Sequence, residues 1–194
     1  MNKNININKI ILASASPRRK QLMQEANISF EIIVSTADEV DNLPPRELVS
    51  ENARIKAEEV SKRNPQRLVL GADTIVAFNN KVFGKPRDIN EAIEMLSTLQ
   101  GNTHSVYTAV CLAKTTEKGT LYYCDVQKSD VQFKSLSLNE IKNYINCVNV
   151  LDKAGAYAAQ EYGEMIIEKI EGDFDNVMGL PMTLVKKMLD TVKI

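Results

Sequence analysis

The chain has 194 residues, of which 44 % are hydrophobic and 25 % are charged, so it is long enough to bury the core of a folded domain. Its 24 basic and 25 acidic residues give a net charge of −1, which argues against general binding of nucleic acids or of anionic membrane surfaces. No apolar run approaches the ~18 residues of a membrane span, and residues 1–9 lack the apolar core of a signal peptide. We therefore expect a cytoplasmic protein that binds a small anionic ligand at a local site.

Predicted strands and helices alternate in the first half of the chain. The hydrophobic patterns predict strands over 9–13, 30–34, 68–78 and 81–83, and helices over 17–26, 44–63 and 89–99. In the second half we expect strands over 103–114, 121–133 and 163–170, a turn at Lys118-Gly119, and helices over 137–147 and 184–192. This order predicts an α/β fold with a mixed sheet flanked by helices. No linker is apparent, so residues 1–194 are expected to form one domain whose two lobes enclose a cleft.

The junction between the first strand and the first helix has the features of an anion site. Ser16 is a good N-cap, and Pro17 suits the first helical position. Arg18 and Arg19 follow, although acidic residues are normally favoured in the first turn of a helix. A helix N-terminus with two added guanidinium groups suits a polyphosphate. The alternative, left open by this motif alone, is that the arginines are solvated or paired with carboxylates elsewhere.

A second candidate site follows the buried strand at Gly71-Ala72-Asp73-Thr74. An acidic side chain inside an apolar pattern is costly to bury without a partner. Asp73 therefore suits a divalent metal ligand, or a group that orients and deprotonates a water molecule. The alternative is an aspartate that closes a turn at the end of the strand.

Three further polar residues lie in segments that suit ligand binding. Lys85 projects from a tight Gly84-Lys85-Pro86 turn, Lys56 lies in a charged helix, and Gln160 follows a stretch of small residues. Gln160 carries both a donor and an acceptor and so can recognise the edge of a nucleobase. No GxxxxGK[ST] phosphate loop occurs in the chain. Taken singly, each of the three is also compatible with an ordinary surface residue.

The cysteines and the single histidine suggest little chemistry. Cys111, Cys124 and Cys147 are odd in number and lack CxxC spacing, which favours reduced thiols over disulfides or a zinc site. A Ser-His-Asp triad would have to use His104, and no nucleophile-elbow sequence is present.

The motifs together resemble the Maf family of nucleoside triphosphate pyrophosphatases over essentially the whole chain, from about Lys9 to the last helix. The segments that carry the resemblance are Ser14-Ala15-Ser16-Pro17-Arg18-Arg19, Ile55-Lys56-Ala57, Gly71-Ala72-Asp73-Thr74-Ile75-Val76, Gly84-Lys85-Pro86, Gly101-Asn102-Thr103-His104-Ser105-Val106-Tyr107-Thr108, Asp152-Lys153-Ala154-Gly155-Ala156-Tyr157 and Gly179-Leu180-Pro181. The resemblance implies an elongated α/β fold with a deep cleft, similar to the inosine triphosphate pyrophosphatases. It also implies cleavage between the α- and β-phosphates, with a requirement for a divalent cation, Mg²⁺ or Mn²⁺.

The resemblance and the chemistry of the side chains together suggest roles for individual residues. Asp73 is the expected proton acceptor, and Asp73 with Glu39 the expected metal ligands. The expected phosphate-binding residues are Ser16, Arg18, Arg19, Lys56 and Lys85. The residues expected to select dTTP and UTP are Arg18, Thr74 and Gln160. The family often has Gln-Gly where this chain has Gln160-Glu161, so the chain departs from the family pattern beside the expected base pocket.

Two other functions are compatible with the same resemblance. A sister branch that acts on 7-methylguanosine triphosphate has glutamate at the position of Gln160. Because the family is associated with septum formation, the chain is alternatively a nucleotide-sensing regulator that hydrolyses nothing. The presence of Asp73 and Glu39 favours the enzyme. A homodimer is compatible with the resemblance, although the sequence identifies no interface, and neither a nucleic acid nor a membrane is an expected partner.

Overall fold

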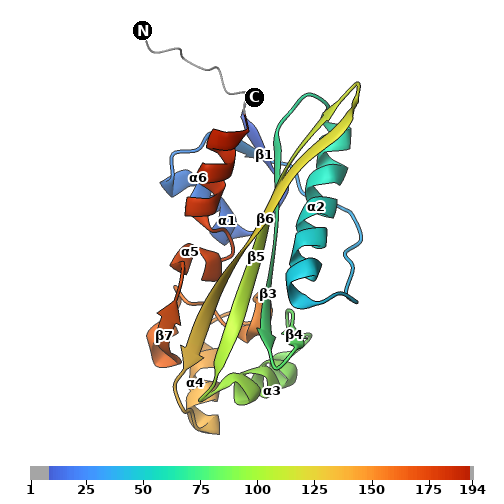
Figure 1. Ribbon diagram of the computed structural model, residues 1–194. Coiled ribbons are helices and arrows are strands. Elements are labelled where there is room, and N and C mark those ends of the chain that lie inside the picture. Colours follow the sequence, from blue (N-terminus) through green and yellow to red (C-terminus); the bar gives the residue numbers. More distant parts are fainter. Residues whose placement is uncertain (1–8, 193–194) are drawn as a thin grey trace.

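A mixed sheet of seven strands runs through this computed structural model, which describes residues 9–192 (Figure 1). The strands are β1 (Ile10–Leu12), β2 (Phe30–Ile32), β3 (Val69–Phe78), β4 (Lys81–Phe83), β5 (Thr103–Thr116), β6 (Gly119–Phe133) and β7 (Ile167–Glu171). Their order is β2-β1-β3-β5-β6-β7, and β4 pairs with β3. The two β1 pairings are parallel and the others are antiparallel. The sheet is therefore mixed, as the sequence predicts.

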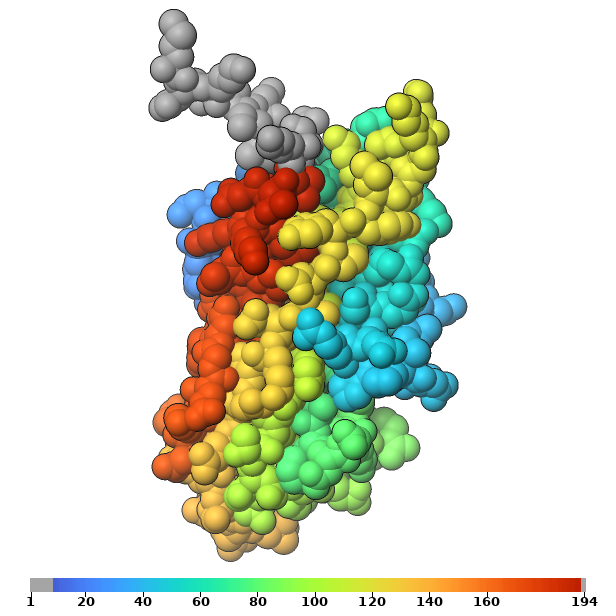
Figure 2. Space-filling view, viewed as in Figure 1, coloured from blue at the N-terminus to red at the C-terminus, as the bar shows by residue number. Residues whose placement is uncertain are grey.

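Helices cover the sheet at several points along its length. They are α1 (Pro17–Glu25), α2 (Pro45–Arg63), α3 (Ile89–Leu99), α4 (Leu138–Cys147), α5 (Phe174–Val177) and α6 (Met182–Thr191), with short 3₁₀ turns η1 (Ala154–Ala156) and η2 (Gly163–Met165). The body is elongated, with the tip of the β5–β6 hairpin at one end and α3 and α4 at the other (Figure 2). The fold class predicted from the sequence is confirmed.

Alternation along β3 determines which helices its side chains face. Leu70 and Ala72 join the apolar cluster of α1 and α6, whereas Val69 and Ile75 join the cluster of α2. Successive side chains of a strand point to opposite faces. Asp73 therefore projects to the α2 side of the sheet, and the next residue of β3 projects to the α1 side.

The edge of β3 that faces β1 and β4 is interrupted. β1 pairs with β3 at Val69 and Leu70, and β4 pairs with it from Val76 onward. Among the described residues, no strand pairs with β3 on this edge between Gly71 and Ile75. The chain segments that follow β1 and β4 both reach this gap, so they can deliver side chains to either side of β3.

Helix boundaries were predicted well where local capping determines them. α3 spans the predicted residues, and Ser137 and Glu140 form the capping box at the start of α4. The strand predicted over 163–170 is wrong in its first half, where η2 occupies Gly163–Met165. Tyr162, just before it, adopts a left-handed conformation with φ 54°. α5 was not predicted. The prediction that the N-terminal segment lacks a signal peptide concerns residues 1–9, of which 1–8 lie outside the described residues.

The prediction of reduced cysteines is wrong for two of the three residues. Cys111 and Cys124 lie directly opposite each other on β5 and β6 and form a disulfide, whereas Cys147 is free and exposed. The two residues are equidistant from the two-residue turn at Glu117 and Lys118, so the register of the hairpin brings them together.

Within residues 9–192 no helix combines the length and apolar character that crossing a membrane requires.

Candidate active site

A cavity of about 880 Å³ fills the gap at the edge of β3. This volume falls within the range of small-molecule binding sites. Its walls come from the segment after β1, the loop before α2, α2 itself, the turn after β4, and the two loops around residues 152–160 and 177–179. The site residues predicted from the sequence all line this cavity: Ser16, Arg18, Arg19, Glu39, Lys56, Asp73, Thr74, Lys85 and Gln160.

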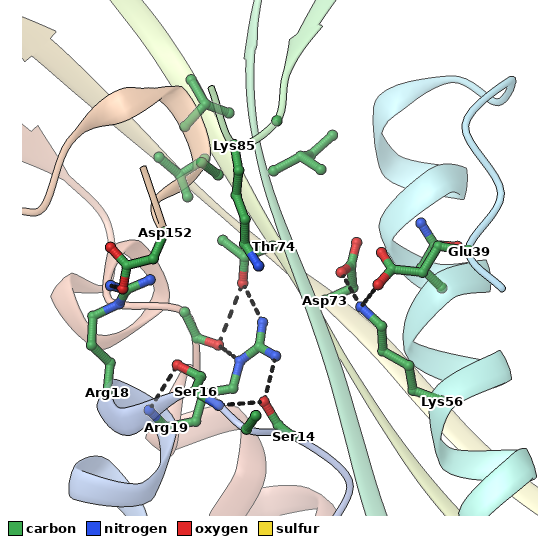
Figure 3. Close-up of a pocket in the computed structure, with 18 of the residues that line it drawn as sticks. Ser14, Ser16, Arg18, Arg19, Glu39, Lys56, Asp73, Thr74, Lys85 and Asp152 are labelled. Atoms are coloured by element: carbon green, nitrogen blue, oxygen red, sulfur yellow. Dashed lines mark hydrogen bonds and ion pairs between the residues drawn. The ribbon is translucent and has the colours of Figure 1, made fainter. Parts of the chain in front are cut away.

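The N-terminus of α1 forms one wall of the cavity (Figure 3). Ser16 is the N-cap, and its Oγ accepts a hydrogen bond from the Arg19 backbone N–H at 3.4 Å. Pro17 occupies the first helical position, and the first turn holds no acidic residue. The capping geometry predicted from the sequence is therefore present, and the positive end of the helix meets the cavity.

Arg19 is held in place by neutral oxygen atoms. Its Nε donates to the Gly179 carbonyl at 2.8 Å, and its Nη2 donates to Thr74 Oγ1 at 3.0 Å. Its Nη1 donates to the Ala72 carbonyl at 2.9 Å and to Ser14 Oγ at 3.1 Å. Four of the five guanidinium N–H donors are thus used within the protein. Burial of this group lowers its pKa from the ordinary value, and the cation forms no ion pair with a described carboxylate.

Arg18 is adjacent in sequence but is held loosely. Its Nη1 lies 3.7 Å from Asp152 Oδ2, and the Asp152 side chain is largely exposed. Burial alone would raise the pKa of Asp152, but the hydrogen bond from Lys153 and the charges of Lys153 and Arg18 lower it. Arg18 therefore keeps donors that a ligand can use.

The opposite wall joins two carboxylates through one ammonium group. Lys56 Nζ, on α2, lies 2.7 Å from Asp73 Oδ1 and 3.0 Å from Glu39 Oε1 (Figure 3). Asp73 is buried inside β3, so the alternative of a turn-closing aspartate is wrong. The partly buried, paired Lys56 is likewise not an ordinary solvated lysine.

The close approach of α2 to β3 depends on Gly71. A Cβ added there would lie 2.4 Å from the Ala53 carbonyl oxygen and 2.7 Å from the Ala57 backbone nitrogen. These distances are far shorter than van der Waals contact, so only glycine permits this packing. Because Gly71 has no side chain, α2 packs close to β3, and Lys56 on α2 can therefore reach Asp73 on β3.

The two carboxylates fit the expected divalent cation. Their oxygen atoms already converge on one positive charge, the ammonium of Lys56, and carboxylate oxygens are the donors that Mg²⁺ and Mn²⁺ prefer. Within residues 9–192 there is no cluster of three or more His, Cys, Asp or Glu side chains that suits a metal. Mg²⁺ is commonly held by one or two carboxylates together with substrate phosphates and water, so two protein ligands suffice.

Lys85 and Gln160 complete the polar lining. Lys85 is exposed on the turn after β4 and forms no ion pair with a described residue. Gln160 is partly buried, and its Oε1 is a buried atom without a hydrogen-bond partner among the described residues. Tyr144 fixes the backbone just before it, because its hydroxyl accepts from the Ala158 N–H at 2.9 Å.

His104 does not belong to this site. It is buried, its Nε2 lies 2.9 Å from Tyr157 Oη, and its ring stacks edge-on against Phe133. Burial lowers the pKa of His104 to about 4, so the ring is neutral at physiological pH. The single histidine therefore has a packing role, and the described residues contain no Ser-His-Asp triad.

Some site residues were not identified individually from the sequence. Ser14 and Gly179 supply acceptors to Arg19, and Asp152 is the partner of Arg18. Lys153 is buried beside Asp152, which is unusual for lysine. The one feature of the sequence that could have identified Asp152 and Lys153 is the pair of adjacent opposite charges in a stretch of small residues.

Comparisons with known proteins agree with this geometry. The family model described as Maf-like protein matches residues 9–192. The chain belongs to the Maf family. A protein named dTTP/UTP pyrophosphatase from Akkermansia muciniphila is 44 % identical over 183 residues, covering 93 % of this chain and 95 % of the relative. Proteins of the same name from Thermoanaerobacter sp. and Clostridium perfringens are each 43 % identical, covering 95 % and 96 % of this chain and 95 % and 98 % of the relatives. The resemblance inferred from the motifs is confirmed.

Proposed function

We propose that this chain hydrolyses dTTP and UTP to the nucleoside monophosphate and pyrophosphate, and so removes these nucleotides from the cellular pool. The observation that carries the proposal is a single cavity in which a cationic wall faces the buried Asp73, paired with Lys56. The names of the relatives, which match nearly the full length of the chain, support the same reaction.

The triphosphate is expected to lie against the cationic wall. The N-terminus of α1 offers backbone N–H groups near Ser16 and a positive partial charge. Arg18 and the remaining N–H of Arg19, from α1, and Lys85, from the turn after β4, supply cationic donors. These groups stabilise the negative charge that moves onto the pyrophosphate leaving group as the bond to the α-phosphorus breaks.

Asp73 is the proposed proton acceptor for the attacking water. As the new oxygen–phosphorus bond forms, the proton of the water passes to the Asp73 carboxylate and pyrophosphate leaves. An aspartate has an ordinary pKa of ~3.9 and is a weak base for free water. Asp73 and Glu39 would hold a divalent cation, which would supply charge neutralisation and a more acidic water. Lys56 holds the two carboxylates together and can turn to a phosphate oxygen.

The residues proposed to select the base are Arg18, Thr74 and Gln160, because each lines the cavity. Thr74 Oγ1 already accepts from Arg19 and lies 3.0 Å from Thr108 Oγ1, so Thr74 shapes the pocket. Gln160 lines the cavity and its amide carries both a donor and an acceptor, so it is the group proposed to form a hydrogen bond with the base. The effect of these residues is expected mainly on KM and selectivity.

Pyrophosphate release from a panel of nucleotides tests the proposal. The panel comprises dTTP, UTP, CTP, dATP, GTP, ITP and 7-methyl-GTP, each with Mg²⁺ and with Mn²⁺. We expect the highest kcat/KM for dTTP and UTP, with the monophosphate as the second product. A preference for 7-methyl-GTP would leave the proposed reaction standing but would show that dTTP and UTP are not the preferred substrates. Binding without release from any nucleotide would favour the regulatory alternative.

Three expectations about the setting of the protein stay predictions. These are the single domain over residues 1–194, the cytoplasmic location, and the absence of nucleic-acid and membrane partners. A homodimer likewise stays a prediction. Sedimentation of the purified chain measures the oligomeric state directly.

A further inference from the structure

The segment that carries Glu39 has few contacts to hold it in place. The connection from β2 to α2 forms no helix or strand, and its residues 38–44 are all exposed. Val40 and Leu43 in this segment each remain 38 % exposed, so packing of apolar side chains stabilises its position only slightly. The ion pair of Glu39 with Lys56 is also weak on its own, because the Glu39 side chain is 52 % exposed and water screens exposed ion pairs.

Asn52 connects this segment to α2. The asparagine is buried, with an exposed fraction of 3 %. Its Oδ1 accepts a hydrogen bond from the Val40 backbone N–H at 2.9 Å, and its Nδ2 donates to the Val40 carbonyl at 3.0 Å. Only one orientation of the amide satisfies both backbone groups, so the pairing fixes the side chain as well as the segment. Apart from the ion pair of Glu39, no other hydrogen bond among the described residues joins residues 38–43 to the rest of the chain.

Asn52 and Lys56 act on adjacent residues of the segment. They lie four residues apart on α2, so their side chains share one face of the helix. Both line the cavity, where Lys56 Nζ lies 3.0 Å from Glu39 Oε1 and 2.7 Å from Asp73 Oδ1 (Figure 3). Asn52 holds the backbone of Val40, while Lys56 pairs with the side chain of Glu39. The backbone contact therefore determines where the Glu39 carboxylate can reach.

We propose that Asn52 is a positioning residue: by fixing the Val40 backbone, it places the Glu39 carboxylate in the cavity wall formed by α2. The proposal rests on the proposed function, in which Glu39 and Asp73 would hold the cation. Asn52 is assigned no contact with the substrate or the cation, so its effect passes through Glu39. Replacing a residue that orients a metal ligand typically lowers metal affinity or activity by roughly 10- to 100-fold.

A double-mutant cycle with Asn52→Leu and Glu39→Ala tests the proposal. Leucine favours a helix and is close to asparagine in size, so Asn52→Leu should leave α2 folded while it removes both hydrogen bonds. We expect kcat for dTTP with Mg²⁺ to fall about tenfold in Asn52→Leu, with KM changed by less than about twofold because the cationic wall is intact. In the Glu39→Ala background, the same substitution should lower kcat by less than about twofold, because Asn52 then has no carboxylate to position.

Ser61→Ala is the matched control. Ser61 is another buried polar residue of α2; its Oγ accepts from the Thr115 backbone N–H at 2.8 Å and lies 2.9 Å from Thr115 Oγ1. The substitution therefore also removes two hydrogen bonds from α2, but Ser61 does not line the cavity. We expect kcat to stay within about twofold of the wild type. A kcat as low as that of Asn52→Leu would point to a general loosening of α2 and would overturn the proposal.

Hydrogen exchange of the Val40 amide, followed by NMR, gives a readout that does not depend on turnover. This amide donates to Asn52, so its exchange should be about tenfold faster in Asn52→Leu and unchanged in Ser61→Ala. Unchanged exchange in Asn52→Leu would overturn the proposal. So would a fall in kcat that is equal in the presence and in the absence of Glu39, because Asn52 would then act independently of the carboxylate.

Failure of the proposed function is distinguishable from failure of this inference. If the wild type released no pyrophosphate, the proposed function would fail, and the same cycle would be read from the dissociation constant of Mn²⁺ measured by calorimetry. Asn52→Leu should then weaken Mn²⁺ binding about tenfold when Glu39 is present and by less than about twofold in Glu39→Ala. Equal effects in the two backgrounds, or a wild type that binds no Mn²⁺, would overturn the inference.

Discussion

The two walls of the cavity hold their charged groups in different ways. On the α1 side, Arg19 donates to neutral oxygens of Gly179, Ala72, Ser14 and Thr74, and no described carboxylate pairs with it. On the α2 side, the single ammonium of Lys56 lies between two carboxylates. The first wall therefore keeps a fixed positive charge, whereas the second carries an excess of negative charge.

This difference supports the proposed division of the reaction between the two walls. A fixed cation with neutral partners attracts an anion without having to break an ion pair, so the α1 wall suits the triphosphate. Carboxylates that share one cation can accept another, so the α2 wall suits a metal ion and a proton. β3 separates the two because Asp73 and Thr74 project to opposite sides of the strand.

The largest expected effect on stability comes from breaking the α1 wall. In Arg19→Lys, an ammonium cannot reach acceptors in three directions, and buried oxygens lose their donor. We expect a loss of about 3 kcal/mol in the free energy of unfolding, or roughly 9 °C in Tm, measured by thermal denaturation. The neighbouring Arg18→Lys is the matched control and should cost less than about 1 kcal/mol. Equal losses in the two variants would show that Arg19 is not fixed as described.

A smaller effect is expected from separating the α2 wall from β3. In Gly71→Ala, the added Cβ meets the backbone of Ala53 and Ala57, so α2 must move outward. We expect a loss of about 2 kcal/mol, typical of overpacking, together with a reduced kcat as Lys56 moves from Asp73.

Gly84→Ala is the control for that variant. A Cβ at Gly84 meets no atom within 4 Å, so we expect a change within about 0.5 kcal/mol. If Gly71→Ala were as stable as Gly84→Ala, the close contact between α2 and β3 would not be what positions Lys56.

The sequence was most informative where neighbouring residues determine the structure. Ser16 and Pro17 predict the start of α1, and Ser137 with Glu140 predicts the start of α4, because capping acts within one turn of helix. The strand order and the gap beside β3 could not be predicted, because they depend on where β1 and β4 stop pairing.

The different environments of Arg18 and Arg19 show most clearly what could not be predicted from the sequence. Both are arginines in the same turn, and the sequence predicted phosphate binding for both. Arg19 is committed to protein acceptors as far away as Gly179, 160 residues along the chain, which no local pattern indicates.

The disulfide between Cys111 and Cys124 was missed partly because the hairpin turn was predicted at Lys118-Gly119, whereas it lies at Glu117-Lys118. A two-residue turn at the predicted position would place Cys111 opposite Val126 instead of Cys124.

The most direct test of the account is Asp73→Asn, assayed for pyrophosphate release from dTTP and for dTTP binding. The substitution keeps the shape of the side chain and removes the proton acceptor. We predict that kcat falls about 10³-fold, within the range for loss of a general base, while the dissociation constant of dTTP changes by less than about threefold because the α1 wall is intact. Wild-type turnover in this variant, or loss of binding together with activity, would contradict the separation of the two walls.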